Sequence, residues 1–205
     1  MSREKHVQTP NIPCGMQPDV TMGATEAWAN SALLVIDVIN DFAFPGADRL
    51  ARQMPAMVEA IDALRRRADA LQRPVIHVND NFGRWRSDFD QVIDYCRRKG
   101  MAGAEMAERL APRDTDYFVL KPGQSGFYQT PLPALLAHLK ISRLVLTGIA
   151  GDQCVLTTAM EAHMRDFELW MPADATASIT PERNRRALDY VSEVLGGSVA
   201  PAAEP

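Results

Sequence analysis

A cysteine within "TGIAGDQCVL" (Thr147–Leu156) is the side chain in this sequence best placed for covalent chemistry. Gly148 and Gly151 loosen the backbone before Cys154, and the sequence pattern predicts that a helix begins near Asp152. Helix N-termini present N–H groups without intrahelical partners, and these favour a nearby negative charge. Because the thiolate is the nucleophilic form of cysteine, this position predicts a Cys154 that ionises readily and attacks a substrate.

A carboxylate and an ammonium stand at the ends of two other apolar segments. Asp37 lies in "ALLVIDV" and Lys121 ends "DYFVLK". If these segments are parallel strands, their carboxyl ends meet at one edge of the sheet, which is where ligands bind in such folds. A carboxylate there can accept the thiol proton and return it to a leaving group, and an ammonium stabilises a thiolate. The three groups together therefore predict a nucleophilic active site.

The turn that leads to Cys154 adds a further catalytic element. Between Ala150 and Cys154 the chain offers backbone N–H groups to the oxygen of a substrate carbonyl. Preorganised donors of this kind stabilise the oxyanion that develops during acyl transfer. The sequence thus predicts an oxyanion hole built from backbone beside the thiol.

Short apolar segments alternate with amphipathic ones along the chain. The pattern predicts strands at residues 32–38, 74–78, 116–121, 143–149 and 168–172, with a weak sixth in "GGSVA" (196–200). It predicts helices within residues 54–71, 90–99, 104–110, 130–140, 152–167 and 180–195, the last with Thr180 as N-cap and Pro181 at its first position. This alternation is typical of an α/β fold: a parallel sheet covered by helices on both faces, as a three-layer α-β-α sandwich.

The length and composition fit one domain. With 205 residues, of which 46% are hydrophobic, the chain can bury a sizeable core. We expect an irregular N-terminal arm over residues 1–30, a single domain over 31–199 and a loose tail over 200–205.

Charge and cysteine content exclude several classes of partner. The net charge of −4 argues against nucleic-acid binding, and no apolar run reaches the ~20 residues that span a membrane. The N-terminal residues lack the apolar core of a signal peptide. Cys14, Cys96 and Cys154 show no disulfide-framework spacing. We therefore expect a cytoplasmic protein with reduced thiols.

Four segments resemble the isochorismatase-like cysteine hydrolases, a superfamily that includes nicotinamidases, N-carbamoylsarcosine amidohydrolase and related amidases and ureidases. The segments are "LLVIDVINDF" (Leu33–Phe42), "LKPGQSGFYQTPL" (Leu120–Leu132), "LTGIAGDQCVLTTAMEA" (Leu146–Ala162) and "PADATAS" (Pro172–Ser178). They occur in the family's order, and the resemblance extends from about Ser31 to the C-terminal helix.

The resemblance implies a mostly parallel, Rossmann-like sheet of six strands and a catalytic triad of Asp37, Lys121 and Cys154. It also implies a non-proline cis peptide between Ile149 and Ala150, which would direct the N–H of Ala150, together with that of Cys154, at the substrate carbonyl oxygen. Members of the superfamily usually assemble, so a homodimer or homotetramer is expected.

Two departures from named members of the superfamily narrow the expected activity. Nicotinamidases hold a metal with an Asp-x-His pair and a further histidine, whereas "NDNFGRWRSDF" after the second predicted strand contains no histidine. We therefore expect no metal, no cofactor and no nicotinamidase activity. Isochorismatases that cleave a vinyl ether lack cysteine at the nucleophile position, so Cys154 favours hydrolysis of a small amide or ureide C–N bond through a thioester.

The expected substrate contacts come from two regions. Phe42 follows the first motif and Phe127 lies within the lysine motif, so both aromatic rings are candidates to pack on the substrate. Trp85 follows the second predicted strand, and Arg84 or Arg86 beside it is a candidate to pair with a substrate carboxylate.

Three other functions remain open on the sequence. The first is vinyl-ether hydrolysis of the isochorismatase type, with Asp37 as the acid and Cys154 only packing. The second is a nucleotide- or flavin-binding α/β domain, although "TGIAGD" lacks both the G-x-G-x-x-G spacing and a P-loop lysine. The third is a thiol redox sensor that pairs Cys154 with Cys14 or Cys96, for which there is no C-x-x-C spacing.

Overall fold

A six-stranded parallel sheet forms the centre of the protein. The computed structural model describes residues 28–86, 88–98 and 101–203; most of the predicted N-terminal arm, residues 1–27, lies outside them. The strands are β1 (Ser31–Ile36), β2 (Val75–Asp80), β3 (Tyr117–Lys121), β4 (Arg143–Ile149), β5 (Glu168–Trp170) and β6 (Thr176–Ala177). Their order is β3-β2-β1-β4-β5, with β6 paired to β4, and every pairing is parallel. The predicted fold class is confirmed.

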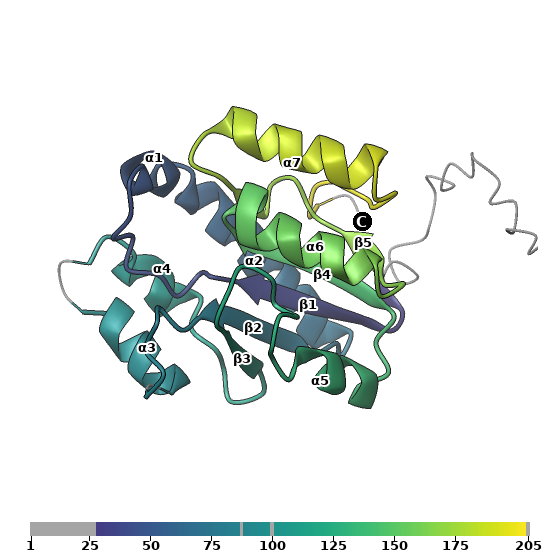
Figure 1. Ribbon diagram of the computed structural model, residues 1–205, viewed down its shortest axis with the longest axis horizontal. Helices are drawn as coiled ribbons and strands as arrows, with labels where there is room; N and C mark the ends of the chain where they lie inside the picture. Colours follow the sequence, from purple (N-terminus) through teal and green to yellow (C-terminus); the bar gives the residue numbers. More distant parts are fainter. Residues whose placement is uncertain (1–27, 87, 99–100, 204–205) are drawn as a thin grey trace, which may run out of the picture.

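Helices cover both faces of the sheet (Figure 1). One apolar cluster joins the sheet to α1 (Ala47–Ala51), α2 (Met54–Ala70), α3 (Phe89–Cys96) and α4 (Ala104–Arg109). A second cluster joins its other face to α5 (Leu132–His138), α6 (Leu156–His163) and α7 (Pro181–Glu193). All six residues of β1 are buried, as expected of a central strand with helices on both sides.

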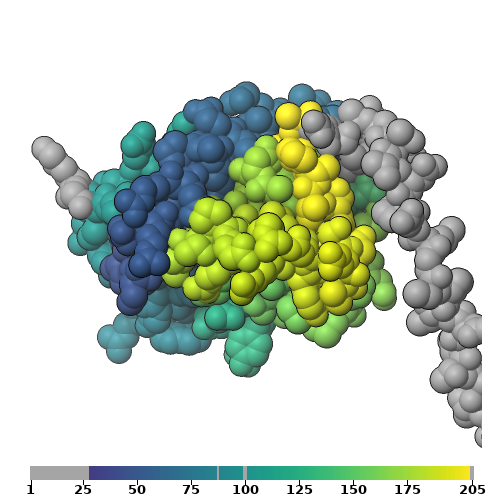
Figure 2. Space-filling model, turned by 90° about the horizontal axis from the view of Figure 1, so that it is seen from above, coloured from purple at the N-terminus to yellow at the C-terminus, as the bar shows by residue number. Residues whose placement is uncertain are grey.

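The last helix begins where the sequence predicts. Thr180 has extended backbone angles, its hydroxyl accepts a hydrogen bond from the Arg183 N–H at 3.3 Å, and Pro181 is the first helical residue. Figure 2 shows α7 and the residues after it on one side of the molecule, next to the purple and blue N-terminal helices. The Gln53 side chain joins the two regions by donating to the Ser178 carbonyl at 2.7 Å.

The sixth strand differs from its prediction. It is Thr176–Ala177, within the segment after β5, whereas "GGSVA" contributes only an isolated bridge between Ser198 and Trp170. Gly196 has a φ of 66°, which turns the chain and leaves no room for a regular strand.

The tail is attached to the domain as far as it is described. The indole N–H of Trp170 donates to the Ala200 carbonyl at 2.8 Å, and the Ala202 N–H donates to the Asp174 carboxylate at 2.8 Å. Ala200 and Ala202 are therefore held on the domain, while residues 204 and 205 of the predicted loose tail lie outside the described residues. Among the described residues, no helix combines the length and the apolar character that crossing a membrane requires.

The N-cap of α7 gives a stability prediction. Thr180→Ala removes the acceptor for the Arg183 N–H, so the free energy of unfolding should fall by about 1 kcal/mol. Thr180→Ser keeps the acceptor and should lie within about 0.5 kcal/mol of the wild type. Urea denaturation followed by circular dichroism measures both. Equal stability of Thr180→Ala and wild type would show that this hydrogen bond contributes nothing.

Candidate active site

The chemically reactive side chains gather at the carboxyl edge of the sheet. Asp37 directly follows β1, Asp80 ends β2 and Lys121 ends β3. Cys154 lies in a π-helical turn (Gly151–Val155) between β4 and α6. Four consecutive strands in the sheet order thus each deliver one group, because all their carboxyl ends point the same way.

Lys121 is at the centre of this group. Its Nζ lies 2.9 Å from Asp37 Oδ2 and 3.4 Å from Cys154 Sγ, and it donates to the Gly123 carbonyl at 2.9 Å. Asp37 and Cys154 thus both contact the same ammonium, and the negative charge of Asp37 acts on the pKa of Cys154. The structure therefore brings together the three residues that the sequence singled out.

The Asp37 carboxylate is held from two sides. Its Oδ1 accepts the backbone N–H of Asp80 at 2.7 Å, while its Oδ2 meets Lys121. Asp37 has a left-handed backbone with a φ of 51°, and its own N–H donates to the Val78 carbonyl at 2.9 Å. This arrangement fixes the carboxylate between β2 and the ammonium, with little freedom to turn away.

The turn that carries Cys154 is packed against the segment before α7. A Cβ on Gly151 would lie 2.1 Å from the Asn184 side-chain oxygen, so this position requires glycine. Ser178 accepts the Asp152 N–H at 3.0 Å and donates to Asn184 at 3.0 Å. Asp152 was predicted near the start of a helix; it lies within the turn, and its carboxylate pairs with Arg183 while Thr180 caps the later helix.

The two residues predicted to form an oxyanion hole lie at the start of this turn, Ala150, and within it, Cys154. The peptide bond between Ile149 and Ala150 is cis. The Ala150 carbonyl accepts the N–H groups of Gln153 and Val155, at 2.9 and 3.2 Å. Ala150 is partly exposed beside Cys154 at the N-terminal end of the turn. The use of the Ala150 and Cys154 N–H groups as oxyanion donors stays a prediction.

The loop after Lys121 is fastened to the helix that follows Cys154. Ser125 donates to the Glu161 carboxylate at 2.6 Å, and the Gly126 N–H donates to Thr158 Oγ1 at 3.0 Å. Because Lys121 also donates to Gly123 in this loop, the ammonium and the thiol are positioned by one connected set of contacts.

Burial and charge set the protonation of the thiol. Burial and then the negative charge of Asp37 raise the pKa of Cys154 to about 12, against the opposing effect of Lys121. Burial and Asp37 thus oppose the expected ready ionisation of the resting thiol, and the effect of Asp37 exceeds that of Lys121. Burial also raises the pKa of Asp37, although Lys121 opposes this, so the carboxylate is a stronger base than one in water.

Lys121 remains charged in the same environment. Burial lowers its pKa, but the attraction of Asp37 and Cys154 more than compensates, so the pKa lies above its usual value. The ammonium therefore stays beside Asp37, the group placed to accept the thiol proton.

The predicted aromatic contacts are buried in apolar packing. Phe42 is 7% exposed and stacks on Phe44 with 5.8 Å between ring centroids. Phe127 is 3% exposed and packs on Phe167 at 5.9 Å. Both rings belong to the cores on either side of the sheet. Contact of either ring with a substrate stays a prediction.

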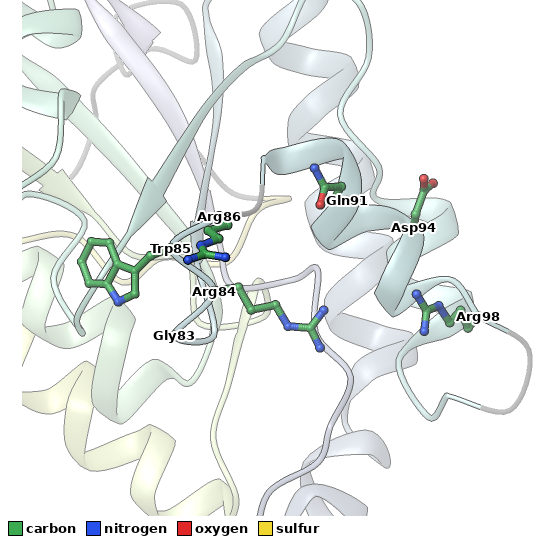
Figure 3. Close-up of a pocket in the computed structure, with 7 residues that line it drawn as sticks. All are labelled: Gly83, Arg84, Trp85, Arg86, Gln91, Asp94 and Arg98. Atoms are coloured by element: carbon green, nitrogen blue, oxygen red, sulfur yellow. The ribbon is translucent and has the colours of Figure 1, made fainter.

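Arg84, Trp85 and Arg86 line a surface groove of about 630 Å³, together with Gly83, Gln91, Asp94 and Arg98. The Arg84 guanidinium lies 3.9 Å from the centroid of the Tyr95 ring. Arg84 extends toward α3, whereas the exposed Trp85 points away from it (Figure 3). The structure thus gathers these residues in a groove whose lining does not include the Asp37, Lys121 and Cys154 cluster.

Asp80 is the member of the site that sequence reasoning missed. Its Oδ2 lies 3.6 Å from Lys121 Nζ, and 36% of its side chain is exposed. The sequence signal was the length of the second strand, predicted to end at Val78 but continuing to Asp80. If the predicted strand had been two residues longer, it would have placed this carboxylate at the same edge of the sheet.

Among the described residues, no histidine forms a hydrogen bond or ion pair with Asp37, Lys121 or Cys154. His77, in β2, is buried, and its Nε2 lies 3.2 Å from Asp116 Oδ2. Across residues 28–86, 88–98 and 101–203, no cluster of three or more His, Cys, Asp or Glu side chains is arranged to hold a metal ion.

The chain matches the family model for the isochorismatase domain over residues 31–203. It is 37% identical over 167 residues to the uncharacterized isochorismatase family protein YaaI of Bacillus subtilis, covering 82% of this chain and 91% of that protein. It is 35% identical over 105 residues to the ureidoacrylate amidohydrolase RutB of Methylobacterium radiotolerans, covering 51% of this chain and 41% of that protein.

Solved structures show the same architecture. N-carbamoylsarcosine amidase from Thermoplasma acidophilum is 28% identical, with a TM-score of 0.64, over 85% of this chain and 98% of that one. The nicotinamidase of Staphylococcus aureus is 24% identical, with a TM-score of 0.65, over 83% and 96%. At that identity the second likeness concerns the fold alone.

The pKa of the thiol predicts an unusual effect of one substitution. Asp37→Asn removes the negative charge that raises the Cys154 pKa, so more thiolate should be present at pH 8. A tenfold gain in thiolate, partly offset by the weaker nucleophilicity of a less basic thiolate, should accelerate alkylation by iodoacetamide about threefold or more. Mass spectrometry of the Cys154 peptide measures the rate.

Cys154→Ser reports the background from Cys14 and Cys96 in the same experiment. The wild-type rate should rise continuously from pH 7 to pH 10, because a thiol with a pKa of about 12 gains thiolate throughout that range. Slower alkylation in a folded Asp37→Asn protein would contradict this account and indicate that Asp37 already ionises the resting thiol.

Proposed function

The chain belongs to the isochorismatase family, and we propose that it hydrolyses a C–N bond of a small amide or ureide through a thioester on Cys154. The observation that carries this proposal is the meeting of a thiol, a carboxylate and a buried ammonium, with Lys121 Nζ 2.9 Å from Asp37 and 3.4 Å from Cys154. Among the relatives, one is named an amidase and another an amidohydrolase, which supports the choice of bond.

In the first half of the reaction, Cys154 Sγ attacks the carbonyl carbon while its proton passes to Asp37. The C–S bond forms and the carbonyl electrons move to oxygen, where the N–H groups of Ala150 and Cys154 stabilise the charge. Protonated Asp37 then gives the proton to the nitrogen as the C–N bond breaks, so that ammonia or an amine leaves and a thioester remains.

In the second half, Asp37 takes a proton from water as the water attacks the thioester carbonyl. The C–S bond breaks, the acid leaves, and the proton returns to the sulfur. Lys121 stays protonated throughout and stabilises each anion that forms beside it. Because the raised pKa of Asp37 brings its proton affinity closer to that of the thiol, transfer during attack costs less than it would to a carboxylate in water.

The nucleophile is tested by ammonia release from a panel of small amides and ureides. Cys154→Ser and Cys154→Ala should each reduce kcat/KM by at least about 10³-fold, as loss of a nucleophile does in other triads. Cys96→Ser is the matched control, since that buried thiol lies in α3, and it should keep near-wild-type turnover. Turnover retained in Cys154→Ala would favour chemistry through Asp37 alone, as in vinyl-ether hydrolysis.

We propose further that the groove beside Trp85 receives a carboxylate of the substrate. Asp80 is at the reacting groups and Gly83 already lines the groove, and three residues of chain span at most about 11 Å. Among the described residues that line this groove are three guanidinium groups and one carboxylate, that of Asp94. A substrate whose amide and carboxylate are a few bonds apart could therefore reach both places, with Arg84 or Arg86 pairing with the carboxylate.

A comparison of carboxylated and neutral substrates in arginine variants tests the groove. Arg84→Ala or Arg86→Ala should raise KM for a carboxylated amide about tenfold, as expected for the loss of one partly exposed ion pair, and leave the matching neutral amide unchanged. Arg66→Ala removes an exposed arginine of α2 and serves as the control. If both groove variants behave like Arg66→Ala on both substrates, the carboxylate is not bound there.

A further inference from the structure

Asp80 is the most exposed charged group of the site. Its side chain is 36% exposed, whereas those of Asp37 and Lys121 are 6% and 0% exposed. Cys154 is also partly exposed. A molecule that enters from solvent therefore meets the sulfur and the Asp80 carboxylate, with the other two groups beneath them.

The Oδ2 oxygen of Asp80 keeps a free capacity to accept a hydrogen bond. Oδ1 accepts the Phe82 N–H at 2.6 Å, which fixes the carboxylate in the turn. An ammonium has three N–H donors, and those of Lys121 are directed at Asp37, Gly123 and Cys154. Asp80 Oδ2, at 3.6 Å from Lys121 Nζ, is thus attracted by charge but receives none of these three protons.

The sulfur and this oxygen are close enough for one amide group to reach both. Both lie close to Lys121 Nζ, at 3.4 and 3.6 Å, so their separation is no more than the sum of these distances. A carbonyl carbon in attack position lies about 3 Å from the sulfur, its nitrogen about 1.3 Å further, and an N–H···O bond spans about 2.9 Å. Placed end to end, these lengths are enough to connect Cys154 Sγ with Asp80 Oδ2.

We propose that Asp80 is a specificity-determining residue that accepts a hydrogen bond from the N–H of the substrate's scissile nitrogen. The inference rests on the proposed amide hydrolysis and adds its substrate class. An ionised carboxylate only accepts hydrogen bonds, so it favours primary amides and ureido groups, which carry N–H donors. Esters and N,N-disubstituted amides offer no such donor and leave Asp80 without a partner.

The charge of the site points the same way. Asp37 and Asp80 together carry two negative charges against the single positive charge of Lys121, with the thiol neutral. A donor-rich, uncharged group next to the reacting carbonyl is therefore favoured there, and an anionic group is repelled. The substrate carboxylate, if there is one, belongs further along the loop, at the groove of Arg84 and Arg86.

Asp80→Asn tests this assignment with almost no change in shape. The new side chain keeps an oxygen for the Phe82 N–H and presents an N–H₂ donor where Oδ2 stood, so the substrate N–H meets another donor. For the best primary amide of the panel, kcat/KM should fall at least about tenfold. For the methyl ester of the same acid it should change less than threefold. Asp114→Asn, in an exposed turn, is the control and should affect neither.

The ratio of amide to ester turnover decides the outcome. A tenfold fall in this ratio for Asp80→Asn supports the inference, and the retained ester turnover shows that Cys154, Asp37 and Lys121 remain in place. An equal loss on both substrates would mean that Asp80 acts only through Lys121, and no loss on either would remove it from the site. Both results overturn this inference alone, whereas a wild type that releases ammonia from no amide overturns the proposed function as well.

Discussion

The ion pair between Lys121 and Asp37 is the interaction on which the rest of the site depends. A lysine whose side chain is 0% exposed must be neutralised, because an isolated buried charge costs several kcal/mol. β3 and β1 are not neighbours in the sheet, so the Lys121 side chain passes the end of β2 to reach Asp37. This route brings the ammonium past Asp80 and explains why a second carboxylate lies next to the first.

The same ion pair affects the pKa of the Cys154 thiol, and its two members act in opposite directions. A cation and a helix N-terminus beside Cys154 both favour a thiolate, but burial and Asp37 together keep the proton on the sulfur. The base lies close to the group that it must deprotonate, since both contact the Lys121 ammonium. Ionisation and attack can then occur together, and the site avoids keeping a reactive thiolate exposed to oxidants between turnovers.

Much of this arrangement could be predicted from the sequence, because a charged residue at the end of an apolar segment marks the end of a buried strand. The apolar segments before Asp37 and Lys121 located two groups, and the topology rule placed them at one edge with Cys154. The sequence did not predict the last two residues of β2, because Asn79 and Asp80 are polar. Asn79 is nevertheless buried, and its side chain forms hydrogen bonds with the backbone of Ile39. A hydropathy pattern cannot reveal that a polar side chain is buried when its hydrogen bonds are made to the backbone of a residue far away in the sequence.

Other features depend on contacts that no local pattern encodes. The two-residue β6 forms because Ala177 and Thr176 lie beside β4, and its length is too short for any periodicity. The π-helical turn at Gly151 follows from close packing on Asn184, which is more than thirty residues away. The pKa of Cys154 depends on whether the negative charge of Asp37 or the positive charge of Lys121 has the larger effect. This balance exists only once the chain has folded.

The order of the strands also has a consequence for synthesis on the ribosome. β1, β2 and β3 lie side by side and come first in the chain, so Asp37 and Lys121 are both made before β4 begins. The nucleophile is synthesised later and takes its place beside them. A nascent polypeptide halted between residues 121 and 154 contains Asp37 and Lys121 but not the nucleophile, so it has no complete catalytic site.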